Sequence, residues 1–245
     1  MGLGVYTATP TTTDATEDKD GQGKVAITAA VITVDAEGKV VACQLDTADL
    51  TVKFTADGKA IANDGFKTKY EQGADYNMVT YGGAKYEWYV QAEALANFAV
   101  GKTVEELKSG AIDETGKAPA GSDLATQATI YLGGYVSAIE KAVANAAHLG
   151  AQAGDTLKLA AVNEISGSTS ATAEAEGLAQ LYTTVTALTL KGETITSCAI
   201  DAVQAKVNFD ATGAVTTDLT APIQTKNELG ENYGMVAYGN AIAEW

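Results

Sequence analysis

The chain has 245 residues, enough for one large domain or two ordinary ones, and its hydrophobic content of 46% favours a packed core over disorder. Acidic residues number 31 and basic residues 16, so the formal net charge is −15, and every basic residue is a lysine. This balance excludes a nucleic-acid-binding protein, which needs a basic face for phosphates, and it removes the bidentate arginine grip on phosphate or carboxylate.

Strands are predicted first along the chain. The β-branched run 25–34 and the alternating run 40–46 flank a hairpin-like turn, and a third strand is predicted over residues 50–54. Alternate residues of the run 40–46, Cys43 among them, fall on one apolar face. We therefore expect Cys43 to be a core residue.

Helices are predicted after these strands. The apolar spacing that follows Trp88 is typical of an amphipathic helix with a buried face of Ala92, Leu95, Ala96 and Ala99. Residues 103–106 read as a capping box that opens a short second helix, and 120–135 is predicted to be a turn and a strand. A last helix is expected to close at His148 and Gly150, which makes the single histidine a helix-end residue and not a metal ligand. Strands first and helices after predict an α+β fold, an antiparallel sheet with helices packed on it.

The second half of the chain repeats the first. The segment 68–88 aligns with 225–245 without a gap, and shorter upstream stretches align in the same order. We therefore predict two tandem modules, a complete one over residues 1–150 and a second, C-terminally incomplete copy over residues 151–245.

The duplication has two structural consequences. Cys43 and Cys198 occupy equivalent positions, so we expect both to be buried thiols that are not bonded to each other. The second module lacks a counterpart of residues 89–150, so its sheet should leave an apolar face and Trp245 uncovered. We expect that face to be covered by the first module, by further residues, or by self-association with another copy of the chain.

The first candidate binding segment is a glycine-containing loop. Met78, Tyr81, Gly82 and Gly83 lie in this loop, directly before a helix predicted over residues 84–99. Free N–H groups at a helix N-terminus would bind an anion, and the Met and Tyr side chains, present in both modules, would pack on a flat aromatic ligand. The alternative is that the glycines serve only a tight turn into the helix.

The second candidate segment is DLATQAT, residues 123–129. It resembles D-x-x-[ST]-G-A-T, the signature of the bacterial FMN-binding domain of surface lipoproteins and of flavin subunits in ion-pumping redox complexes. The residues that match are Asp123, Thr126, Ala128 and Thr129. Gln127 stands where the family has glycine. The order of the hairpin VITVDAEGKVV, the glycine loop, the signature and a final helix is also similar to the family, over residues 21–146. The alternative is that 123–129 is a polar turn before an ordinary strand.

This resemblance implies that FMN is carried on Thr129 through a phosphoester bond, which needs no arginine clamp because the bond itself holds the cofactor. It further implies an extracellular, cell-surface or membrane-anchored electron-transfer module with a redox partner at the cell surface, whose signal peptide is absent from this chain. The alternative hypothesis is a non-enzymatic surface protein, structural or interacting, whose repeated modules have lost the ligand.

The neighbourhood of Gln127 should be concave under the first hypothesis and a filled surface under the second. A hydrolase or transferase has no catalytic constellation in the sequence, and we predict no enzyme activity and no metal site.

Overall fold

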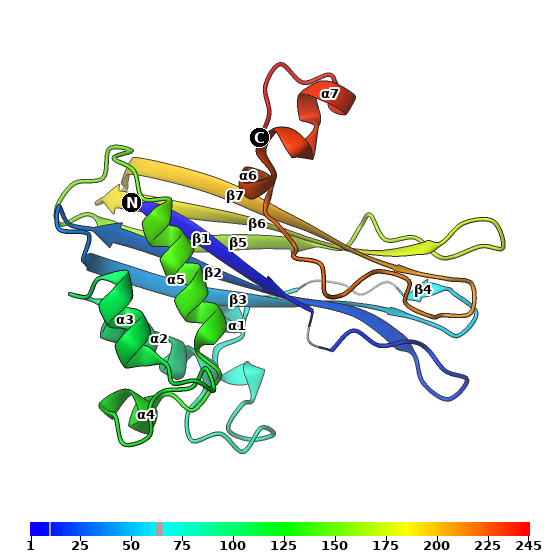
Figure 1. The fold of residues 1–245 in the computed structure, drawn as a ribbon, viewed down its shortest axis with the longest axis horizontal. Helices are drawn as coiled ribbons and strands as arrows, with labels where there is room; N and C mark the ends of the chain where they lie inside the picture. Colours follow the sequence, from blue (N-terminus) through cyan, green and yellow to red (C-terminus); the bar gives the residue numbers. More distant parts are fainter. Residues whose placement is uncertain (10, 62–65) are drawn as a thin grey trace.

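Two antiparallel sheets form the body of the molecule in the computed structural model, which describes residues 1–9, 11–61 and 66–245 (Figure 1). The strand order is β1-β2-β3-β4 in the first sheet and β5-β6-β7 in the second. The strands are β1 (Gly2–Ala8), β2 (Gly21–Val34), β3 (Val40–Phe54), β4 (Ala60–Ile61), β5 (Thr156–Glu164), β6 (Gly177–Lys191) and β7 (Thr194–Phe209). With helices on the first sheet, this is the predicted α+β fold.

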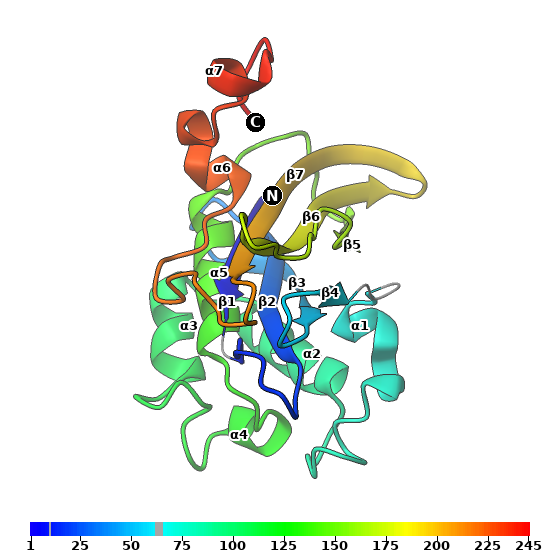
Figure 2. The same cartoon turned by 90° about the vertical axis from the view of Figure 1, so that its right-hand side faces the viewer.

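Helices lie mainly on the outer face of the first sheet, so the layers are second sheet, first sheet and helices (Figure 2). The helical elements are α1 (Lys69–Gln72), η1 (Gly73–Tyr76), α2 (Trp88–Ala99), α3 (Val104–Ala111), α4 (Asp123–Gln127), α5 (Gly133–Ala144), α6 (Lys226–Leu229), η2 (Gly230–Tyr233) and α7 (Met235–Gly239). No helix of the described chain has the length and apolar character needed to cross a membrane.

The inner faces of the two sheets share one apolar core. It contains alternate residues of β2 and β3, such as Val25 and Leu50, together with alternate residues of β6 and β7, such as Leu181 and Val207. This alternation is expected for strands that bury one face, because successive side chains point to opposite sides of a sheet. A second core lies between the outer face of the first sheet and helices α2, α3 and α5.

The duplicated sequence forms duplicated structure. Both sheets contain three antiparallel strands in chain order, β1-β2-β3 and β5-β6-β7, and the equivalent cysteines sit at equivalent register positions, Cys43 opposite Ile32 and Cys198 opposite Leu188. Helices α1 and α6 each begin with a capping box, and each leads into a 3₁₀ helix. The predicted shared strand order is therefore confirmed for three strands, while the module boundary near residue 150 stays a prediction.

An approximate two-fold relation links the two modules at their interface. The equivalent Phe54 and Phe209 rings stack face to face with centroids 4.0 Å apart and an interplanar angle of 4°. Equivalent loops exchange reciprocal hydrogen bonds. The amide of Ala15 donates to the Gly213 carbonyl at 2.8 Å, and the amide of the equivalent Ala171 in the second module donates to the Gly58 carbonyl in the first at 2.7 Å. The modules therefore pair as two copies of one protein would in a symmetric dimer.

Two strand predictions were incomplete. Strand β1 was not predicted, because its glycines resemble a loop; a Cβ at Gly2 or Gly4 would overlap the backbone of Ala142 or Ala138, so these glycines let α5 lie close to the strand. Strand β3 is continuous where two strands were expected, because the polar residues in its middle are satisfied there. The Thr28 and Thr47 hydroxyls, for example, lie 3.0 Å apart across β2 and β3.

Two predictions in the segment 120–150 were wrong. Residues 123–127 form helix α4, capped by the Ser122 hydroxyl, and no strand lies between α4 and α5. Helix α5 ends at Ala144 and not at His148, because the Asn145 side chain turns back to donate a hydrogen bond to the Leu3 carbonyl at 3.0 Å.

The prediction of two buried thiols holds in part for Cys43, which is half-buried against the second core, and fails for Cys198. Burial raises the pKa of Cys43 to about 12, consistent with a core thiol, whereas Cys198 is exposed; both are free. The prediction of a buried Cys198 was wrong because the second module has no counterpart of the helices that cover Cys43.

Candidate functional site

The two candidate segments, far apart in sequence, meet at one buried side chain. Gln91, on the inner side of α2, is fully buried. Its Oε1 atom accepts from the Thr129 amide at 2.8 Å, from the Thr129 hydroxyl at 3.2 Å and from the Ile130 amide at 3.2 Å. Its Nε2 atom donates to the Tyr86 carbonyl at 2.7 Å and lies 3.5 Å from Met78 Sδ. Sequence reasoning missed Gln91, although a glutamine within an apolar helical face is the signal that would have identified it.

A glutamate occupies the amide donors of the glycine loop. Glu87 accepts from the backbone N–H groups of Met78 at 2.9 Å and of Val79 at 3.2 Å, and α2 begins at Trp88 and not at residue 84. Glu244 makes the same two bonds to Met235 and Val236 in the second module. A carboxylate of the protein itself therefore sits where an anion would bind.

The other loop residues lie at the surface. Tyr81 is 85% exposed. A Cβ at Gly82 would lie 2.6 Å from the Met78 carbonyl oxygen, whereas Gly83 has a φ of +62° and open space around it. Both glycines are thus explained by a tight turn, the alternative interpretation of this loop.

The signature-like segment presents an accessible hydroxyl. Thr129 and Gln127 are exposed, Ala128 is buried, and the Thr126 hydroxyl donates to the Asp123 carbonyl within α4 at 2.7 Å. Lys85 Nζ lies 3.3 Å from the Thr126 carbonyl. The segment thus presents the Thr129 hydroxyl and, beside the Thr126 carbonyl, the Lys85 cation.

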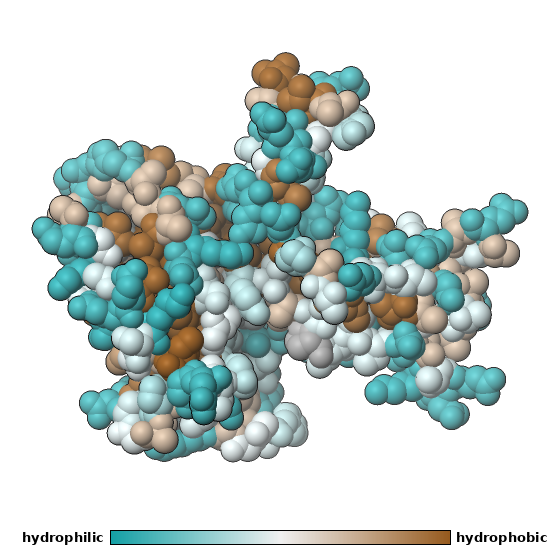
Figure 3. All heavy atoms as spheres, viewed as in Figure 1, coloured by the Kyte–Doolittle hydropathy of each residue, from teal (hydrophilic) through white to brown (hydrophobic). Residues whose placement is uncertain are grey.

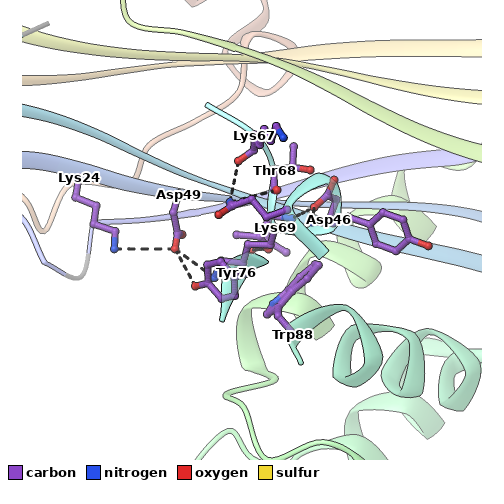
Figure 4. Close-up of polar contacts among 12 residues, drawn as sticks. Lys24, Asp46, Asp49, Lys67, Thr68, Lys69, Tyr76 and Trp88 are labelled. Carbon is purple, nitrogen blue, oxygen red and sulfur yellow. Dashed lines mark hydrogen bonds and ion pairs between the residues drawn. The ribbon is translucent and has the colours of Figure 1, made fainter. Parts of the chain in front are cut away.

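A lysine at the centre of the first module lies among a carboxylate and two aromatic rings (Figure 4). Lys69 Nζ is 3.3 Å from Asp49, which also lies 4.0 Å from Lys24, and it faces the rings of Tyr76 at 5.0 Å and Trp88 at 5.9 Å. The Lys69 side chain is only 12% exposed, so its charge is compensated inside the fold.

The surroundings of Lys69 keep it protonated. Burial lowers the pKa of Lys69, but the neighbouring Tyr135, Asp49 and Tyr76 outweigh burial, so the net shift of the pKa is upward. Tyr135 also accepts from the Trp88 indole N–H at 2.7 Å. Lys69 therefore acts as a fixed cation that holds the start of α2 against the sheet, and not as a general base.

The equivalent lysine of the second module lies in an aromatic cage without a carboxylate. Lys226 Nζ donates to the Tyr182 hydroxyl at 2.7 Å and faces the rings of Tyr182, Tyr233 and Trp245 at 4.8, 4.7 and 4.3 Å. Gln204 takes the position of Asp49 and accepts from the Tyr233 hydroxyl at 3.3 Å. The identity of the two lysines in the repeat was the sequence signal for both clusters.

Equivalent aspartates hold the short helices that carry these lysines. Asp46 accepts from the amides of Thr47 at 2.7 Å and Tyr70 at 3.1 Å, and Asp201 accepts from those of Ala202 at 2.7 Å and Asn227 at 3.1 Å. Burial raises the pKa of both carboxyls, and the hydrogen bonds they accept only partly oppose it.

Asp46 should give the protein a distinctive pH dependence. Because its folded pKa lies above the unfolded value of 3.8, its contribution to stability is full below that value and is lost as pH rises through the folded pKa. We therefore expect the free energy of unfolding of Asp46→Asn, relative to that of the wild type, to increase as pH rises through this window. Asp218 is the control, because hydrogen bonds from the Thr220 side chain and amide lower its pKa. The free energy of unfolding of Asp218→Asn, relative to that of the wild type, should therefore decrease as pH rises. Urea unfolding from about pH 3 to about pH 7 measures both, and parallel curves for the two variants would contradict this assignment.

The modules differ most in what covers their outer sheet faces. The equivalent Leu45 and Ile200 are 5% and 48% exposed, and the equivalent Trp88 and Trp245 are 1% and 41% exposed. We call the outer face of β6 and β7 the open face; its members are Leu188, Cys198 and Ile200, with Trp245 at its border. The prediction of an uncovered apolar face with Trp245 exposed is confirmed, and the first module does not cover it.

Two related cavities lie between the modules. One of about 470 Å³, between α2, β3 and β5, is lined by residues that include Asp46, Tyr70, Glu93, Asn97 and Lys158. Its counterpart of about 310 Å³, between β1, the residues that follow α5, β7 and α6, borders the open face at Ile200. The larger cavity offers groups of both charges, which suits a small polar molecule. The residues predicted to bind FMN line neither cavity.

Comparison with known proteins returned no match: no family model, no curated protein and no solved structure is similar to the chain. The resemblance to the FMN-binding domain therefore stays a prediction.

Proposed function

We propose that this chain is a non-enzymatic, extracytoplasmic interaction protein built from two copies of one module. The observation that carries the proposal is the recurrence of the same polar contacts in both modules. Asp46 and Asp201 bind equivalent amides, and Glu87 and Glu244 close equivalent loops. Carboxylates that already accept hydrogen bonds from the protein's own backbone amides are not available to transfer protons or to bind a substrate.

The feature that distinguishes the modules is the remaining candidate for function. Helices bury the outer face of the first sheet, while the open face of the second carries apolar side chains at the surface. Exposed apolar surface of this kind is typical of protein interaction sites. The extracytoplasmic location is supported by the family resemblance alone.

The exposed thiol on the open face allows a direct test of the interaction function. A thiol-reactive photocrosslinker should label the exposed Cys198 much faster than Cys43, which is only partly exposed and whose raised pKa of about 12 keeps it protonated. On the envelope of the source cells, we expect a discrete crosslinked product from Cys198. The matched control carries Cys198→Ser with Tyr131→Cys, a surface position on the helical side of the molecule. Equal products from both positions, or none from Cys198, would refute the proposal.

Flavin attachment is the second candidate, and it is favoured by the exposed Thr129, with Lys85 bound to the Thr126 carbonyl of the same segment. FMN bound there would supply one- or two-electron transfer, with Thr129 as the attachment point and Lys85 beside the phosphate. A redox partner at the cell surface would then exchange electrons with it.

Coexpression with a flavin transferase separates the two candidates. We expect a colourless protein with the mass of the unmodified 25.1 kDa chain. A yellow protein whose added mass is lost in Thr129→Val and gained more fully in Gln127→Gly would instead establish flavin attachment, because glycine restores the signature. Thr126→Val, which leaves the Thr129 hydroxyl intact, is the control.

A further inference from the structure

The larger cavity, of about 470 Å³, lies at the edge where the two modules meet. Strand β3 and helices α1 and α2 of the first module form most of its wall, and Lys158 and Leu159 of β5 belong to the second module. The Leu159 amide donates to Gln44 Oε1 at 3.0 Å, which links the two modules in this wall. The volume lies within the range of pockets that bind small molecules, about 300–1,000 Å³. The pairing of the modules therefore creates a pocket of suitable size.

The elements that cover the first module line these cavities without filling them. Helix α2 lines the larger cavity through residues that include Ala92 and Ala96. The segment that follows α5 lines the smaller cavity through Asn145 and Leu149, and about 310 Å³ remains beside it. A hollow thus recurs at both edges of the interface, and it is a consequence of how the modules pair.

Charged and polar groups from three elements line the larger cavity. Glu93 and Asn97 lie one turn apart on α2, so they share one face of that helix. The Tyr70 hydroxyl of α1 donates to Glu93 Oε1 at 3.2 Å and orients this carboxylate. Asp46, the other carboxyl in the wall, already accepts two backbone amides. Lys158 is exposed and forms no ion pair with another residue that the structure describes.

The smaller cavity lacks this pair of charges. Gly2 of β1 takes the register position of Lys158 in β5, so no ammonium group stands there. The carboxylate of the smaller cavity, Glu228, is bound by Lys141 at 2.5 Å. The two cavities are therefore related by the repeat but differ in chemistry, and the smaller one is an internal control for the larger.

We propose that the larger cavity binds a free α-amino acid with an apolar side chain. The ammonium group of the ligand binds the Glu93 carboxylate, and the ligand carboxylate binds Lys158 and the Asn97 amide. Its side chain lies against the apolar part of the wall, which includes Leu45 and Ala96. Hydrophilic side chains are spread over the face seen in Figure 3 and the net charge is −15, so the protein repels a simple anion. This inference goes beyond the proposed interaction function and does not involve the open face.

Two-dimensional amide NMR spectra of the whole chain test the site. L-Leucine is titrated to about 10 mM, which detects dissociation constants into the millimolar range. We expect the amide signals of Tyr70 and Leu159 at the larger cavity to shift, and those of the equivalent Asn227 and Leu3 at the smaller cavity to stay. Leucinamide lacks the carboxylate and isocaproate lacks the amine, so each should bind at least about tenfold more weakly.

Lys158→Gln and Glu93→Gln should each weaken L-leucine binding at least about tenfold, because each removes a hydrogen bond to a charged group. Lys206→Gln is the matched control, since it removes the same charge from an exposed position of β7 outside the cavity, and it should bind as the wild type does. The inference is overturned if L-leucine shifts neither Tyr70 nor Leu159, if leucinamide or isocaproate binds equally well, or if either cavity variant keeps the wild-type affinity. The crosslinking test of the interaction function is unaffected by any of these results.

Discussion

Trp88→Ala is expected to lower the free energy of unfolding by about 3–5 kcal/mol, whereas Trp245→Ala should cost far less. The Trp88 ring is fully buried beneath the first sheet, and its indole N–H donates to the Tyr135 hydroxyl at 2.7 Å. Removing it leaves a large cavity and an unpaired hydroxyl. Trp245 is partly exposed and rests mainly on Lys226, so water fills the space that its removal leaves. Urea unfolding of the two single variants gives both values.

A second equivalent pair provides the control. Leu45→Ala should lower the free energy of unfolding by about 2–5 kcal/mol, because the Leu45 side chain is buried under helices. Ile200→Ala should lower it much less, because about half of Ile200 is exposed to solvent. Equal losses at equivalent positions in both pairs would mean that the open face is covered in solution, which would contradict the exposure described above.

Phe54→Ala and Phe209→Ala should each destabilise the whole molecule by about 3–5 kcal/mol, because both rings are fully buried where the modules meet. The rings stack on each other at 4.0 Å, so each single variant already removes the contact. The double variant should therefore cost less than the sum of the two, by about 0.5–1.5 kcal/mol. A double-mutant cycle by urea unfolding measures this coupling.

Phe98 supplies a reference away from this interface, because it packs on the helical side of the molecule against Gly110. Phe98→Ala combined with Phe209→Ala should be additive within about 0.5 kcal/mol. Two separate unfolding transitions, with Phe54→Ala shifting only one of them, would show that the modules fold independently and that their interface contributes little.

Local patterns predicted the elements whose signals lie within a few residues of each other. The apolar spacing after Trp88 predicted α2, and the capping box at Thr103 predicted α3, with its Glu106 side chain bonded back as expected. The duplication was visible in sequence because both copies keep the same residues in the same order. Strand β1 was not visible, since its glycines make sense only against α5, more than a hundred residues later.

The candidate site shows the same division. The two segments 78–83 and 123–129 were identified separately from sequence, but only the folded chain joins them through Gln91. The anion site expected from the glycine loop depended on free amides, and the structure gives the amides of Met78 and Val79 to Glu87. The sequence identifies the hydrogen-bond donors and acceptors, whereas only the tertiary structure determines which of them are already paired with each other.

By itself the sequence determined that two modules share one pattern of strands, caps and apolar positions, because that pattern is local and is written twice. The sequence also predicted that the second sheet lacks the helices of the first, but only the tertiary structure decided that the first module does not cover it instead, so that Leu45 is buried and Ile200 is exposed. Burial is a property of what packs against a side chain, and the helices that cover the first sheet come from residues 88–144, outside the strands they cover. Equivalent residues with equivalent neighbours in sequence thus form a core in one module and an open surface in the other.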